Sequence, residues 1–196
     1  MSTGIATSFA IGGLLLLSIL FLNLNMSQSS TSLTLRQITQ QNIQATSQIL
    51  THDFSKIGFD QYKNIDDPII AADSNRIVFK SNIDDSSATE TVEWFYNTSA
   101  PVSSSANPDD YSLQRSIDGL TTDINVGITA FKMTFLDENS TVIPTPISTQ
   151  SDRNRIRQIT VEATVSSKEQ LGKIGSDDGE TIHSTWTKTF SPKNIN

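Results

Sequence analysis

The first 35 residues of the chain carry no charged side chain, and the first charge is Arg36. Within this stretch, residues Ile5 to Leu24 form an almost unbroken apolar run. A helix of that length is about 30 Å long, which is enough to cross the hydrocarbon core of a bilayer. Because the run would be apolar on all sides, it does not suit an amphipathic core helix. We therefore expect a retained, membrane-spanning anchor at about residues 5–24.

A cleaved signal peptide is the alternative interpretation of the same run. Signal peptides have a basic segment before the apolar run and a small-residue cleavage site after it. No Lys or Arg precedes Ile5, and the sequence NLNMSQSS follows the run. The large polar C-terminal part then favours the N-terminus inside and the C-terminus outside. The expected location is a single-pass protein of the bacterial inner membrane, with its C-terminal domain periplasmic or at the cell surface.

A helical pattern continues well beyond the apolar run, because residues 26–57 contain no Gly and no Pro. Two apolar series have helical spacing; they are Leu35, Ile38, Ala45 and Ile49, and Ile43, Leu50, Phe54 and Ile57. We expect one helix from Ile5 to Ile57, roughly 80 Å long, with Gly58 as its C-cap. The chain then divides into a helical region, 1–57, and a β-rich globular domain, 58–196.

The two halves of this helix have different expected contacts. The lower half is expected to pack on its own domain through Ile43, Leu50, Phe54 and Ile57, whereas Ser27 to Gln41 should protrude. The upper half is expected to pack in the membrane, where the pair Gly12 and Gly13 allows close approach of a neighbouring helix. The residues predicted for that packing are Ile5, Phe9, Gly12, Gly13, Leu16 and Leu20.

The remainder of the chain has the alternation and turn residues of β-structure. Between the strands, Asn97 to Asp110 is predicted to be a loop, and Gln170 to Glu180 is polar and rich in Gly. The predicted strands are Arg76 to Ser81, Thr89 to Tyr96, Tyr111 to Ser116, Val126 to Leu136, Ile156 to Ser166 and His183 to Phe190. The fold class is therefore α+β, a long helix packed on a mostly antiparallel sheet of about five to seven strands, arranged as a meander.

Composition excludes several kinds of function. The formal net charge of −7 argues against a nucleic-acid partner, and the absence of Cys removes disulfides, thiol nucleophiles and Cys-based metal sites. The histidines, His52 and His183, have no evident catalytic partners, and adjacent residues such as His52 and Asp53 are not expected to face each other on a helix. We expect no enzymatic activity, no cofactor and no small-molecule substrate.

Three other groups of residues allow a second interpretation. Paired acids such as Asp84 and Asp85 suit turns, with loop calcium binding as the alternative; the other pairs are Asp66–Asp67, Asp109–Asp110 and Asp177–Asp178. Trp94, Phe95 and Tyr96 suit core packing, with a binding patch as the alternative. Arg153, Arg155 and Arg157 would share one face of a strand entry, as a solvated edge or as a surface for an acidic partner.

Four segments of the chain, taken in order, resemble those of type IV pilin-like proteins. The helix ends in LTHDFSKIGF (Leu50 to Phe59), and RIVFKS (Arg76 to Ser81) precedes Asp84. Val92 to Tyr96 leads to Leu113, Gln114 and Arg115. The segment from Ile124 to Leu136 is followed by Arg155 to Val161. The nearest likeness is to the W-class minor pilins and to the J-type pseudopilins of type II secretion.

The resemblance implies a structural or assembly subunit whose partners are other pilin-like subunits and the membrane. One feature departs from the family. Its prepilin peptidase site has a basic leader, Gly, an aromatic residue and a Glu at the fifth mature position. Here Ile5 follows Gly4, and Phe9 occupies the position of the Glu. We expect an uncleaved, permanently anchored relative, or a chain numbered from an unusual start. A membrane-tethered binding or adhesion module that forms no filament is the alternative function.

Overall fold

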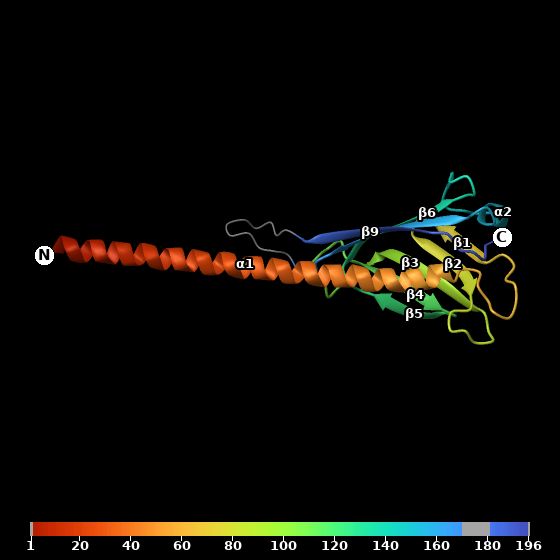
Figure 1. Ribbon diagram of the computed structural model, residues 1–196, viewed down its shortest axis with the longest axis horizontal. Coiled ribbons are helices and arrows are strands. Elements are labelled where there is room, and N and C mark those ends of the chain that lie inside the picture. Colours follow the sequence, from red (N-terminus) through yellow and green to blue (C-terminus); the bar gives the residue numbers. More distant parts are fainter. Residues whose placement is uncertain (1, 170–180, 196) are drawn as a thin grey trace.

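A single long helix dominates the molecule and carries a β-rich domain at its C-terminal end (Figure 1). The computed structural model describes residues 2–169 and 181–195. Helix α1 (Ser2–Ser55) is continuous, so it is about 80 Å long. The expected α+β fold with one long N-terminal helix is confirmed. The predicted loop at Gln170 to Glu180 lies outside the described residues.

The β domain contains two antiparallel sheets and one short helix in the part of the chain that the structure describes. The first sheet has the order β1-β2-β3-β4-β5, and the second has the order β7-β6-β8-β9. The elements after α1 are β1 (Ile69–Asp73), β2 (Arg76–Ser81), β3 (Glu90–Pro101), β4 (Tyr111–Ile117), β5 (Leu120–Ile124), β6 (Ile128–Leu136), β7 (Val142–Ile143), α2 (Gln150–Arg153), β8 (Gln158–Ser166) and β9 (His183–Phe190).

The prediction of a single meander is wrong, because only the first sheet is one. After β5 the chain leaves that sheet at Gly127, which has a left-handed φ of +91°. The Gly127 carbonyl accepts a hydrogen bond from the Ser166 amide, and a Cβ at this position would lie 2.2 Å from the Ser166 carbonyl oxygen. This close approach needs glycine and starts β6 beside β8 in a second sheet.

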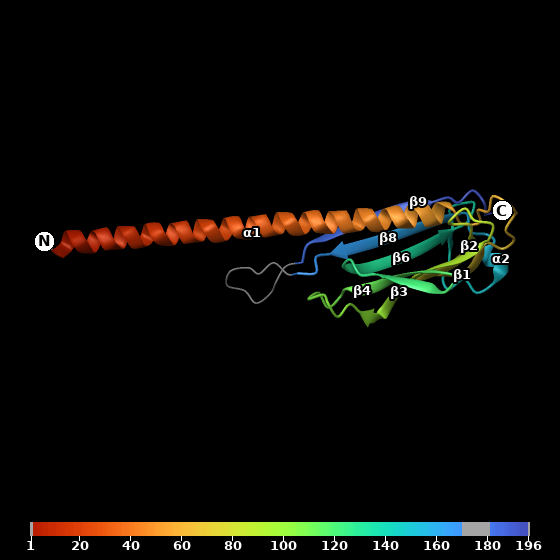
Figure 2. The same ribbon diagram turned by 90° about the horizontal axis from the view of Figure 1, so that it is seen from below.

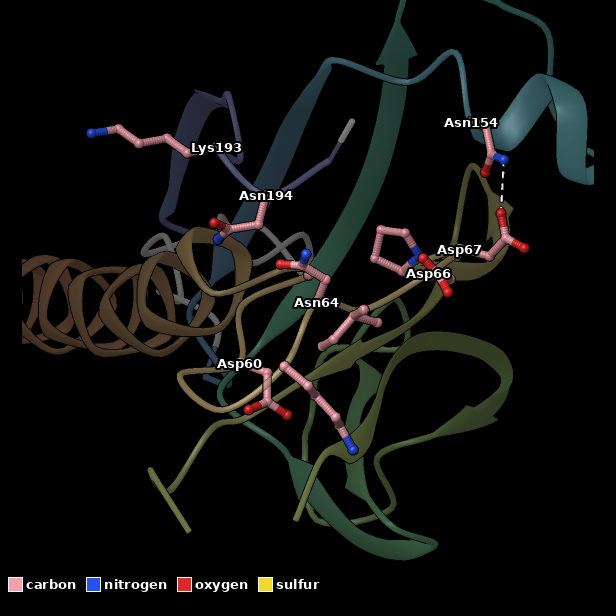
Figure 3. A pocket seen from close by; sticks show the side chains of 11 residues that line it. Asp60, Asn64, Asp66, Asp67, Asn154, Lys193 and Asn194 are labelled. Atoms are coloured by element: carbon pink, nitrogen blue, oxygen red, sulfur yellow. Dashed lines mark hydrogen bonds between the residues drawn. The ribbon is translucent and has the colours of Figure 1, made fainter. Parts of the chain in front are cut away.

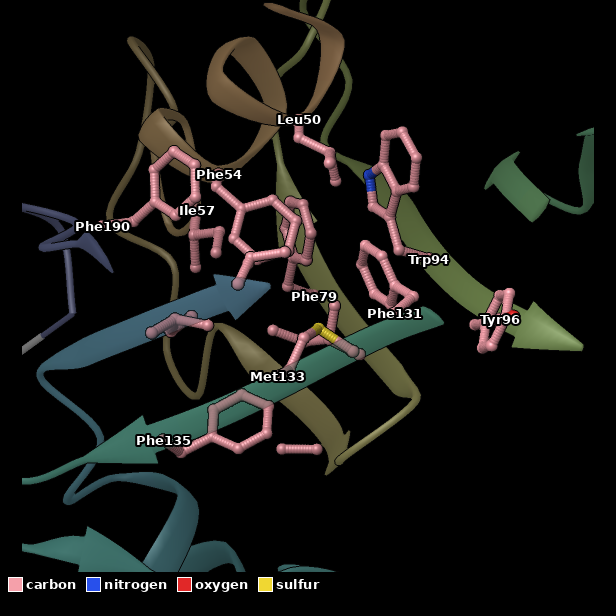
Figure 4. Close-up of a cluster of buried hydrophobic side chains, with 14 of the residues drawn as sticks. Leu50, Phe54, Ile57, Phe79, Trp94, Tyr96, Phe131, Met133, Phe135 and Phe190 are labelled. Atoms are coloured by element: carbon pink, nitrogen blue, oxygen red, sulfur yellow. The ribbon is translucent and has the colours of Figure 1, made fainter. Parts of the chain in front are cut away.

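The C-terminal half of α1 packs against both sheets. Leu50, Phe54 and Ile57 are fully buried, and Ile43 is 3% exposed. Phe54 joins the two sheets, since its ring lies 6.1 Å from that of Phe79 in β2 and 5.1 Å from that of Phe190 in β9 (Figure 4). Figure 2 shows this half of the helix running along β8 and β9. The core of the domain is therefore built around the end of α1.

Only one of the two apolar series of the helix is buried. Ile38 and Ile49 are 46% and 41% exposed, and Ala45 is also exposed. The buried face is completed by Thr39 and Thr46 instead. The physical reason is geometric, because a helix lying on a domain turns one stripe of its surface toward the core.

Several predicted boundaries differ from the observed ones. The bounds of β2 and β9 coincide with the prediction, whereas β1 and β5 were not predicted. Strand β3 continues to Pro101, into the segment that was expected to be a loop. The helix ends at Ser55, so Gly58 is not its immediate C-cap. Gly58 instead lies in the following turn with φ +73°, and a Cβ there would lie 2.6 Å from the Asn194 carbonyl oxygen.

Candidate assembly helix and its buried ion pair

The N-terminal half of α1 extends away from the described part of the domain (Figures 1 and 2), and residues 3–27 are all exposed. It is long and apolar enough to cross a membrane, with a mean hydropathy of 2.4 over its most apolar window, none of which is buried. All six residues predicted for packing in the membrane are exposed in the single chain: Ile5, Phe9, Gly12, Gly13, Leu16 and Leu20. An apolar surface of this kind needs a lipid or protein environment.

The exposed apolar surface continues past Leu24, the end of the apolar run, onto the half of α1 that bears the domain. Ile38, Ala45 and Ile49 are spaced by seven and four residues and so lie on one side of the helix. We call these three residues the helix stripe. Leu35 lies on the same side and is half-buried. The helix stripe lies beside the buried face of α1 and is left uncovered by both sheets.

A buried carboxylate fixes the other side of α1 to the first sheet. Asp53 is fully buried and receives two hydrogen bonds from Arg115 in β4. Arg115 Nε lies 2.6 Å from Asp53 Oδ2, and a terminal nitrogen of the same guanidinium lies 2.8 Å from Oδ1. The Trp94 indole of β3 donates a third bond, 2.9 Å long, to Oδ2. This paired, two-point geometry is the strongest form of carboxylate recognition by arginine.

The charges of this pair compensate each other inside the domain. The hydrogen bonds with Asp53 raise the pKa of Arg115, and they outweigh the opposing effect of its partial burial. The Arg115 side chain keeps 23% of its surface exposed. A buried carboxylate that lost this partner would be costly. The pair therefore ties the orientation of α1 to β3 and β4.

Sequence reasoning missed this role of Asp53. The residue falls between Leu50 and Ile57 on the buried face of the helix, and an acid at such a position needs a cation. The expectation that His52 and Asp53 do not face each other is wrong, since His52 Nδ1 lies 3.2 Å from Asp53 Oδ1. The exposed imidazole reaches the carboxylate over the helix surface, although the two Cβ atoms diverge.

The other candidate residues are placed as follows. Trp94 and Tyr96 are buried in the core. His183 is exposed at the start of β9. Asp67 and Asp85 have left-handed φ values of 50° and 59° in turns. Across residues 2–169 and 181–195 there is no group of three or more His, Asp or Glu side chains placed to hold a metal ion. The pair Asp177–Asp178 lies outside the described residues.

The three arginines do not share one face, contrary to the prediction. Arg153 belongs to α2 and donates to Gln150 and to the carbonyls of residues 147 and 148. Arg155 pairs with Asp137 and Asp152, each at 3.3 Å. Arg157 donates to the backbone carbonyls of residues 154 and 156. The short helix diverts the chain just before β8, which separates Arg153 from the other two.

A polar hollow of about 390 Å³ lies at the end of the domain farthest from the N-terminus (Figures 1 and 3). Its wall is fixed by Asn154, whose amide donates to Asp67 over 2.8 Å and accepts from Gln150 over 2.7 Å. Other polar residues around it are Asp60, Lys63, Asn64, Asp66, Lys193 and Asn194. This hollow is lined by both hydrogen-bond donors and hydrogen-bond acceptors.

Comparisons with known proteins gave no match to this chain: no family model fits the sequence, and no curated protein or solved structure matches it significantly.

Proposed function

We propose that this protein is a non-enzymatic, pilin-like assembly subunit. It is anchored by the N-terminal half of α1 and contacts other pilin-like subunits through the uncovered side of that helix. The β domain is then periplasmic or at the cell surface, and the membrane is the inner membrane. Support comes from the architecture, in which one long helix carries a β domain at one end.

The helix stripe is the observation that carries the proposal. At 1.5 Å per residue, Ile49 lies about 37 Å beyond Leu24, the end of the apolar run, and Ile38 lies about 21 Å beyond it. Both distances exceed the depth of a lipid headgroup region, which adds only about 5–7 Å on each side of the hydrocarbon core. Lipid that covers residues 5–24 therefore leaves Ile49 in water. A subunit that packs by its helix gives the helix stripe a partner, whereas a lone tether does not.

Two of the segments that carry the family resemblance also meet in space. Asp53 comes from the helix end and Arg115 from the Leu113–Arg115 segment, and they form the buried pair. The pair holds the helix stripe in a fixed orientation relative to the domain. A fixed orientation supports an assembly role, because repeated packing between subunits needs each one to present the same surface.

Cysteine crosslinking tests the proposal directly, since the natural chain contains no Cys. In full-length protein in bacterial membranes, Ile49→Cys should give crosslinked dimers and higher species with a short bifunctional maleimide. Gly12→Cys should do the same inside the membrane. Gln48→Cys is the matched control, because Gln48 is also exposed but lies on the polar side of the helix.

The outcomes separate assembly from a tethered module. Strong crosslinking through residue 49 and weak crosslinking through residue 48 supports packing by the helix stripe. Equal yields at the two positions, or no crosslink at residues 12 and 49, would refute it. The polar hollow around Asn154 favours the second candidate, a membrane-tethered binding or adhesion module, and that candidate predicts the absence of crosslinks.

A further inference from the structure

The carboxylate of Asp110 is fully buried, and among the described residues neither of its oxygens has a hydrogen-bond partner. Asp53, the other fully buried aspartate, accepts bonds from Arg115, Trp94 and its neighbour His52. Polar groups that are buried without partners are rare in folded proteins and costly when charged. Within residues 2–169 and 181–195, the two aspartates with no exposed surface are thus in opposite conditions, since Asp53 is compensated and Asp110 is not.

Asp110 closes a short loop between β3 and β4. The loop, residues 102–110, is held by three backbone bonds, from the Val102 amide to the Asp110 carbonyl, from Ser105 to Val102 and from Asp110 to Asn107. These bonds are 2.9, 3.0 and 3.2 Å long. The Asp110 side chain lies toward the start of β6, where the Tyr96 hydroxyl donates to the Ile128 carbonyl over 3.3 Å. The carboxyl group is therefore enclosed between the loop and the second sheet.

The charged and titratable groups around this site give Asp110 little compensation. Four neighbouring groups favour the charged form of the Asp110 carboxyl: the Lys168 ammonium after β8, the Ser105 hydroxyl, and the Gly127 and Ile128 amides. None of them forms a hydrogen bond of normal geometry with it. Burial has the larger effect and raises the pKa of Asp110. In the part of the chain that the structure describes, the other titratable groups at this site are Tyr96, Tyr111 and Asp109. Burial, followed by the charges of these neighbours, raises the pKa of Tyr96 to about 12, so that Tyr96 stays neutral.

The loop lies on the side of the domain from which the anchor extends. Along β3, Trp94 contacts Asp53 of α1, whereas Tyr96 contacts Ile128. Val126, two residues before Ile128, accepts a bond from Asn42 of α1. The end of β3 thus lies nearer to the N-terminal half of α1 than its start does. The loop therefore belongs to the end of the domain that faces the membrane in the proposed orientation.

We propose that Asp110 is a proton-operated latch on the loop of residues 102–110. With a neutral carboxyl the loop is closed against the start of β6, and with a charged carboxylate it opens to let water reach the group. This inference does not depend on the proposed function, because it concerns only the domain. It predicts that acid tightens the loop of residues 102–110 against the start of β6.

The direction of the pH dependence follows from the raised pKa. An aspartate in an open loop or an unfolded chain titrates near 3.8. The closed form, with the higher pKa, holds its proton to a higher pH. Closure of the loop is therefore most favourable at a pH below 3.8, the ordinary pKa of an aspartate. It is lost as the pH rises through the raised pKa of the buried Asp110. Each unit of difference between the two pKa values makes opening about tenfold more frequent above both of them.

Amide hydrogen exchange of the full-length chain in detergent micelles tests the latch. At pH 7, Asp110→Asn should slow exchange of the loop amides of Val102 and Ser105 at least several-fold relative to the wild type. At a pH below 3.8 the two proteins should exchange these amides at equal rates. Asp109→Asn is the matched control, since Asp109 is exposed, and it should behave like the wild type at both pH values.

Three results would overturn the latch: no slowing by Asp110→Asn, equal slowing by Asp109→Asn, or the same slowing at both pH values. A variant that fails to fold still leaves the wild-type test. In the wild type, exchange of the loop amides should rise faster with pH than exchange of exposed backbone amides in the same molecule. Parallel pH profiles would contradict the proposal.

Discussion

The two halves of α1 form one continuous helix but are stabilised by different surroundings. From Ile5 to Leu24 the large apolar side chains are 49–79% exposed, whereas Leu50, Phe54 and Ile57 are fully buried in the domain. The first half depends on lipid or on other chains to cover its apolar surface. The second half depends on the core and on one ion pair. Continuity of a helix therefore does not imply a single source of stability.

The C-terminal half of α1 also has a buried side and an exposed side. One side of it carries Asp53 and Phe54 into the core, and the adjacent side carries the uncovered helix stripe. The first side fixes the helix to the domain, and the second is available to a partner. Substitutions on the two sides should consequently have separable effects on folding and on assembly.

The largest expected effect comes from breaking the buried pair. Arg115→Ala removes the cation that accompanies a fully buried carboxylate, so we expect the free energy of unfolding of the domain to fall by about 3–5 kcal/mol. Urea denaturation followed by tryptophan fluorescence measures the change, with Trp94 next to Asp53 as a local probe.

Arg155→Ala is the control for this experiment. Arg155 is 57% exposed and its two carboxylate partners lie at 3.3 Å, so its removal should cost no more than about 1 kcal/mol. Equal losses for the two variants would show that the buried pair does not hold α1 to the sheet.

The next largest loss of stability is expected at Leu50, and its neighbour Ile49, on a different side of α1, serves as the control. Leu50→Ala empties a fully buried position and should lower the free energy of unfolding by about 2–5 kcal/mol. Ile49→Ala removes a side chain that is 41% exposed, and it should cost less than about 1 kcal/mol. Thermal denaturation of both variants measures the difference. If Ile49→Ala were as destabilising as Leu50→Ala, the helix stripe would be part of the core.

The smallest effect on the stability of the domain is expected from deletion of residues 1–24. Removing residues 1–24 takes away a segment whose residues 3–24 are all exposed, so a soluble protein should remain with an unchanged melting temperature. Near-ultraviolet circular dichroism and calorimetry measure its folding. Aggregation or unfolding of this truncated protein would show that the two halves of α1 are not independent.

Local patterns allowed the helix and several strands to be predicted, but not the pairing of the strands. Helical spacing indicated α1, and alternation indicated β2 and β9. The segment Ile69–Asp73 lacks alternation, and Leu120–Ile124 is a mostly exposed edge strand, so neither has the period of a half-buried strand. The division into two sheets depends on contacts distant in sequence, such as that between Gly127 and Ser166.

The exposed anchor was predictable because its composition alone limits its surroundings. The helix stripe was not predictable, since both apolar series have helical spacing and only the folded domain decides which is covered. The partner of Asp53 was also not predictable, because Arg115 lies 62 residues away in sequence. An acid among buried apolar positions needs a cation nearby, and this signal in the sequence was missed.

The continuous helix has a mechanical consequence. From Leu14 to its end at Ser55, α1 contains no Gly and no Pro, so it should bend little along this length. A pull along its axis would reach the domain along a line of contacts that begins at Gln40 and Asn42. The line continues to Asp53 and Phe54, where the two bonds to Arg115 would be loaded in shear together with the ring contacts. Tension on the N-terminal half of α1 would therefore be shared between the two sheets.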